Sequence, residues 1–104
     1  MFSINGVRWR VRFVDVDAPI LYRYDGSLSI AACDNDTKTL YFANNLHGTK
    51  LKKAISHEVT HAAMFSYGVK LTHDQEELLA DLLATYGEEV IKVANDLFKK
   101  IKGW

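Results

Sequence analysis

The chain has 104 residues, 48% hydrophobic and 25% charged, and its 13 basic and 13 acidic residues give a net charge of zero. This length suits a single domain, residues 1–104, with one hydrophobic core. A balanced charge gives no long-range attraction to nucleic acid or to an anionic membrane, so we expect neither as a partner. The N-terminus lacks the pattern of a secretory signal, and the single cysteine, Cys33, has no internal disulfide partner. Both features favour a cytoplasmic location.

Three segments in the first half of the chain have the patterns of β-strands. Residues 7–14 alternate apolar side chains with arginines, as a strand with one buried face does. The segments 28–33 and 39–43 are two further expected strands. The polar residues 34–37 between them favour a turn and therefore predict a hairpin.

The second half of the chain is predicted to be helical. A first helix is expected from Thr49, a good N-cap, to about Tyr67, where a glycine follows. A second is expected after Thr72, with its apolar positions continuing past Gly87, since a lone glycine costs only about 1 kcal/mol inside a helix. Strands followed by helices predict an α+β fold: a small antiparallel sheet of about three strands packed on the first helix and on a long C-terminal helix. Trp104 alone does not indicate an oligomeric state.

The first helix contains His57-Glu58-Val59-Thr60-His61, the H-E-x-x-H pattern of zinc hydrolases. Residues four apart lie on the same face of a helix, so both imidazoles can reach one Zn²⁺. Glu58 lies about 100° around the helix from His57, beside the metal rather than on it. We therefore expect Glu58 to act as general base toward a water molecule that zinc makes more acidic.

A catalytic zinc takes three protein ligands and leaves one position open, so a third ligand must follow the motif. We expect it to be Glu77, because Asp81 lies four residues further along the same helix face. From there Asp81 is expected to accept a hydrogen bond from the ring of His57, outside the coordination sphere of the metal.

Other residues remain open as the third ligand. Glu76 adjoins Glu77 but lacks a carboxylate at i+4. His73 is a rival because imidazole suits zinc well. If His73 is not a ligand, it is a candidate to donate a hydrogen bond to the developing oxyanion, together with the tyrosines and histidine at positions 41, 47 and 67.

The motif and the downstream Glu77-Leu78-Leu79-Ala80-Asp81 resemble the gluzincin pattern, H-E-x-x-H and then E-x-x-x-D. The strand just before the zinc helix and the stretch from Glu77 to Ala84 resemble the ImmA/IrrE metallopeptidases of bacteria, their phages and mobile elements. The resemblance implies a minimal zincin-like domain in which His57, His61 and Glu77 bind zinc and Glu58 is the general base. It also implies a cytoplasmic protein substrate, such as a transcriptional regulator.

Three functions therefore compete. The first is a zinc endopeptidase that cleaves a protein, with residues 39–43 as an edge strand that pairs with the substrate backbone. The second is a zinc-stabilised protein of a phage or mobile element that captures a partner without cutting it. The third is structural, with His57 and His61 as ordinary polar residues of a helix. Within the protease class, the alternative is a resemblance to the SprT type, with His73 as a third histidine ligand.

Overall fold

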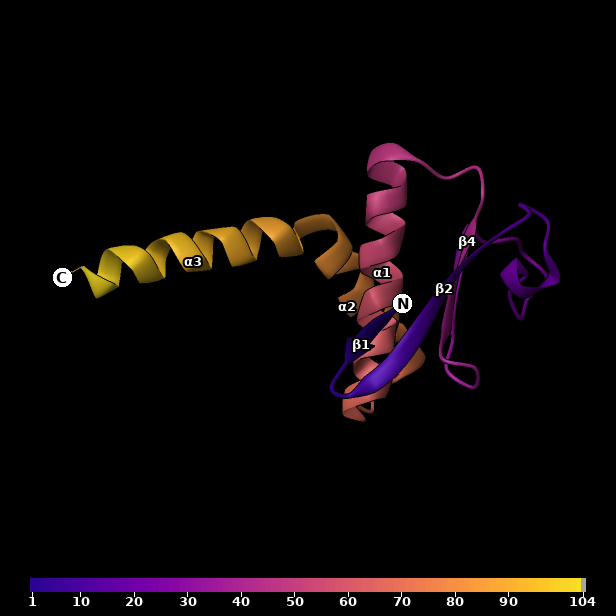
Figure 1. Ribbon diagram of the computed structural model, residues 1–104, viewed down its shortest axis with the longest axis horizontal. Coiled ribbons are helices and arrows are strands. Elements are labelled where there is room, and N and C mark those ends of the chain that lie inside the picture. The colour runs from indigo at the N-terminus through magenta and orange to yellow at the C-terminus, as the bar shows by residue number, and fades with distance from the viewer. Residues whose placement is uncertain (104) are drawn as a thin grey trace.

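The computed structural model describes residues 1–103, and Trp104 lies outside the described residues. Figure 1 shows a sheet on one side of helix α1, helix α2 on the other side, and helix α3 projecting away from both. The elements are β1 (Phe2–Ile4), β2 (Val7–Val14), a short 3₁₀ turn (Pro19–Leu21), β3 (Ala31–Asp34), β4 (Thr39–Ala43), α1 (Gly48–Tyr67), α2 (His73–Leu82), a π-helical turn η2 (Leu83–Gly87) and α3 (Glu88–Lys102). The predicted α+β class is confirmed.

The sheet has four strands in the order β1-β2-β4-β3, one more than predicted. The additional strand β1 pairs antiparallel with β2 through Asn5 and Gly6, whose φ angles of 49° and 76° are those of a tight hairpin turn. β3 and β4 form the predicted antiparallel hairpin, although β3 begins three residues later than expected. β2 and β4 are parallel, so the sheet is mixed rather than antiparallel. The long segment between β2 and β3 makes the crossing that this parallel pair requires.

The strand order corrects one expectation about the site. β4 lies between β2 and β3, so residues 39–43 are a central strand and not an edge strand. All of its residues except Tyr41 are buried, as is usual for a strand with neighbours on both sides. The edge strand on this side of the sheet is β3.

The core forms where the sheet meets α1. Trp9, Leu21, Leu40 and Phe42 are its largest fully buried side chains. The indole Nε1 of Trp9 donates a hydrogen bond of 2.8 Å to Ser66 Oγ on α1, which satisfies the one polar atom of that ring. This contact joins β2 to the last turn of the helix.

Helix α1 ends as predicted but begins differently. Gly68 follows Tyr67 with a φ of 66°, and its backbone N–H bonds to carbonyls of the last turn. The residue before the helix is His47, without a side-chain cap, so Thr49 lies inside the first turn rather than capping it. Because α1 lies between the sheet and α2, both of its sides are covered and even Glu58 and His61 are buried.

From His73 to Lys102 the chain is one helical run, as predicted, with a π-helical turn from Leu83 to Gly87. Thr72 starts it through a capping box: its hydroxyl accepts from the Gln75 backbone, and the Gln75 side chain accepts from the Thr72 backbone. After the π turn, α3 has no buried residue. Within residues 1–103, no helix is long and apolar enough to cross a membrane.

Candidate metal centre

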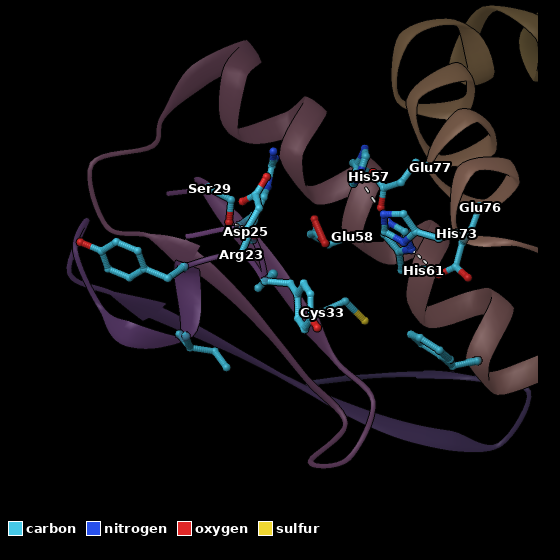
Figure 2. Close-up of a pocket in the computed structure, with 16 residues that line it drawn as sticks. Arg23, Asp25, Ser29, Cys33, His57, Glu58, His61, His73, Glu76 and Glu77 are labelled. Atoms are coloured by element: carbon cyan, nitrogen blue, oxygen red, sulfur yellow. Dashed lines mark hydrogen bonds and ion pairs between the residues drawn. The ribbon is translucent and has the colours of Figure 1, made fainter. Parts of the chain in front are cut away.

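Two helices supply the candidate site. α1 carries His57 and His61 on the side that faces α2, with Glu58 beside them toward the sheet, and α2 carries the carboxylates of Glu76, Glu77 and Asp81. The capping box at Thr72 fixes where α2 begins, and it therefore fixes which acidic residues of its first turn face α1. Figure 2 shows the Glu77 side chain pointing at both imidazole rings.

The expected ligand atoms converge on one point. His57 Nε2 and His61 Nε2 are 3.2 Å apart. Glu77 Oε1 lies 3.0 Å from His61 Nε2, and Glu77 Oε2 lies 3.4 Å from His57 Nε2. One ligand atom from each of the three residues can be chosen so that all lie within 4.8 Å of one another, close enough to hold a metal ion.

The opposite nitrogen of each ring meets a second carboxylate. His57 Nδ1 is 2.9 Å from Asp81 Oδ1, which is the contact that the spacing of Glu77 and Asp81 suggested. His61 Nδ1 is 2.6 Å from Glu76 Oε1, a role that the sequence reasoning missed. A signal for it was present: both histidines of the motif need an Nδ1 partner, and only one had been assigned.

The donor chemistry of this arrangement fits a cation. A carboxylate can only accept a hydrogen bond, so Asp81 and Glu76 favour the tautomer with the proton on Nδ1 of each ring. Both Nε2 atoms then present lone pairs, and Glu77 adds carboxylate lone pairs to the same small space. In that protonation state the three electron-rich groups repel one another, and a positive ion between them removes the repulsion. Two imidazoles and one carboxylate form a ligand set that suits Zn²⁺.

Glu58 lies beside this cluster and outside the set of converging ligand atoms. It is only 7% exposed, and it lines the same pocket as the two histidines. Burial raises the pKa of its carboxyl, while the nearby His57 and His61 act in the opposite direction. A carboxylate with increased proton affinity next to a metal site is the arrangement that a general base requires.

His73 does not join the converging ligand atoms. It is exposed at the start of α2 and lines the same pocket, but it is not part of the group of His57, His61 and Glu77. The other expected oxyanion donors, Tyr41, His47 and Tyr67, do not line this pocket. Of the four expected oxyanion donors, His73 is therefore the one that lines the pocket.

The pocket is an open depression of about 710 Å³ between the two helices and the sheet edge. β3 and the segment that precedes it form the wall opposite the histidines, with Arg23 and Asp25 at the rim (Figure 2). Cys33 of β3 also lines it, and burial together with the carboxylates of Glu58 and Glu76 raises the pKa of its thiol to about 12. Its thiol is not among the converging ligand atoms of His57, His61 and Glu77.

Comparisons with protein-family models, with curated proteins and with solved structures returned no match. The resemblance to gluzincins stays a prediction from the motif.

Proposed function

We propose that this chain is a zinc-dependent endopeptidase in which His57, His61 and Glu77 hold the metal. The observation that carries the proposal is the convergence of His57 Nε2, His61 Nε2 and the Glu77 carboxylate, with Nδ1 of each ring within hydrogen-bond distance of its own carboxylate. The arrangement is typical of metal-binding histidines, whose second nitrogen is normally hydrogen bonded.

The chemistry assigned to the chain's own residues follows from their positions. Zinc held by this ligand set supplies a Lewis acid that polarises the scissile carbonyl and makes water more acidic. Glu58 accepts the proton of the attacking water and passes it to the leaving amine nitrogen. His73, at the pocket wall, donates a hydrogen bond toward the oxygen of the tetrahedral species.

The substrate backbone is proposed to pair with β3. Ala43 N–H bonds to Ile30 O, and this register turns the backbone groups of Ala31 and Cys33 away from β4, toward the free edge. Ser29 Oγ already donates to Ala31 O at that edge, at 2.9 Å. An extended peptide that pairs along β3 passes over the pocket that Glu58 and the histidines line. A protein with an accessible extended segment, such as a regulator with an exposed loop, is the substrate class that suits this geometry.

The test is the substitution Glu58→Gln, measured with zinc-loaded protein on unfolded casein and on a quenched-fluorescent peptide library. We expect wild-type chain to bind one zinc ion and to release fragments, and chelation to stop the cleavage. Glu58→Gln is expected to keep the zinc, by elemental analysis, and to lose cleavage by at least about 100-fold, since general-base catalysis contributes that much.

The controls separate the alternatives. Glu89→Gln makes the same chemical change in an exposed acid of α3 and is expected to leave cleavage unchanged. A wild-type chain that binds zinc but cleaves no substrate would contradict the peptidase assignment and favour a zinc-stabilised binding protein. A chain that binds no zinc would remove the basis of both.

A further inference from the structure

Helix α3 is amphipathic, and within the described residues its apolar face has no partner; Glu88 in its first turn pairs with Lys52 of α1 at 2.8 Å. The helix spans Glu88–Lys102, none of its residues is buried, and it extends away from the sheet and α1 (Figure 1). Val90 is 58% exposed, Leu97 51% and Phe98 65%. Most of the stability of a helix this short comes from packing of its apolar face rather than from the helix itself. The exposed apolar face therefore indicates that α3 packs against another molecule.

The spacing of the apolar residues on α3 suits another helix. Val90, Ala94, Leu97 and Ile101 follow one another at intervals of four, three and four, the repeat of a helix–helix seam. Ile91 and Phe98 broaden this seam on one side, and Val93 does so on the other. The opposite face is polar, and there Lys92 pairs with Asp96 at 2.9 Å. The seam is a single continuous stripe and not a set of scattered apolar residues.

The charges on α3 specify the direction of the partner helix. The first turn carries Glu88 and Glu89, and the last turn carries Lys99, Lys100 and Lys102. A second copy of α3 that runs antiparallel places the acidic end of each helix beside the basic end of the other. The two helix dipoles also oppose each other favourably in that orientation. A parallel copy places like charges together at both ends.

We propose that two copies of this chain associate through α3, packed antiparallel along the seam of Val90, Ala94, Leu97 and Ile101. In the register that aligns the acidic and basic ends, Val90 of one copy lies opposite Ile101 of the other, and Ala94 lies opposite Leu97. Alternating a small with a large residue lets the two helices pack closely. The pairing covers apolar surface that each chain leaves exposed, and it keeps both pockets open because α3 contributes no residue to the pocket.

The first test measures the mass of the full chain in solution by light scattering across the micromolar range. We expect wild-type chain to have twice the monomer mass and Leu97→Asp to have the monomer mass. Asn95→Asp adds the same charge on the polar face of α3 and is expected to remain dimeric. Leu97 is half exposed and makes no part of the core, so zinc binding of Leu97→Asp at α1 and α2 is expected to match that of the wild type.

The second test determines the orientation. In a Cys33→Ser background, Val90→Cys and Ile101→Cys chains are mixed and oxidised, and the products are separated by mass. The antiparallel arrangement predicts that the disulfide between a Val90→Cys chain and an Ile101→Cys chain forms in excess over the two disulfides between identical chains. A monomeric wild-type chain, a dimer that survives Leu97→Asp, or a preference for the self-linked Val90 product would each overturn the proposal.

Discussion

The body of this chain and its last helix use the same kind of helix in opposite ways. In α1 the apolar stripe is broken by histidines and a glutamate, yet packing on two sides buries Glu58 and His61 together with the alanines. In α3 the apolar stripe is uninterrupted, yet no residue is buried. An amphipathic pattern thus indicates which face of a helix will pack, but the topology decides whether the chain itself supplies the partner.

The most direct test of this difference makes the same substitution, phenylalanine to alanine, in both regions. Phe42 lies in the core with 1% exposure, whereas Phe98 lies on α3 with 65% exposure. We expect Phe42→Ala to lower the free energy of unfolding by about 3–5 kcal/mol, because it removes a large buried side chain and leaves a cavity. Phe98→Ala is expected to change it by less than about 0.5 kcal/mol, as is usual for exposed positions.

Urea denaturation followed by circular dichroism measures both variants, in a Leu97→Asp background that keeps the chains monomeric. Similar losses for Phe42→Ala and Phe98→Ala would mean that α3 packs on the body in solution, and the contrast between the two regions would then disappear.

The sequence predicted the helices and the cluster of His57, His61 and Glu77 better than it predicted the sheet. Helices and their ends depend on local signals, such as the capping box at Thr72 and the left-handed Gly68, and these lie within a few residues of the feature they determine. The convergence of Glu77 on the two histidines followed from helix periodicity. The parallel pairing of β2 with β4 depends instead on how the segment 15–30 crosses the sheet, which is a property of the whole fold.

Two errors have specific physical causes. Strand β1 was missed although Asn5-Gly6, a strong hairpin signal, follows it, because a three-residue strand is too short to show alternation. The role of Glu76 was missed because only one of the two histidines had been given a partner. The neighbouring acids of α2 contact different ring atoms: Glu77 lies near Nε2 of both histidines, and Glu76 lies near Nδ1 of His61.

The two carboxylates at the Nδ1 atoms, Glu76 and Asp81, are expected to have unequal effects on zinc affinity when they are removed. Glu76 holds His61 from a more buried position, with 19% of its side chain exposed, whereas Asp81 holds His57 with 68% exposed. Loss of such a supporting carboxylate typically weakens metal binding about 10–100-fold. We expect Glu76→Gln near the upper end of that range and Asp81→Asn near the lower end, because water can replace the exposed partner more easily.

Competition with a fluorescent zinc chelator measures these affinities. Glu89→Gln, in the first turn of α3, serves as the control from the other region and is expected to bind zinc as the wild type does. An effect of Asp81→Asn equal to or greater than that of Glu76→Gln would contradict the ranking by burial.

The smallest expected effect is on the unfolding free energy, from substitutions at the first turns of α2 and α1. Thr72 caps α2 with its side chain, whereas Thr49 lies in the first turn of α1 and is not the residue that caps it. We expect Thr72→Ala to cost about 1 kcal/mol of unfolding free energy, and Thr49→Ala to stay within about 0.5 kcal/mol of the wild type. Because the cap also sets where Glu76 and Glu77 face α1, Thr72→Ala is expected to weaken zinc binding as well, and Thr49→Ala is not. Thermal unfolding with and without zinc measures both, and equal losses for the two threonines would show that Thr49 caps α1, which would then begin two residues later than Gly48.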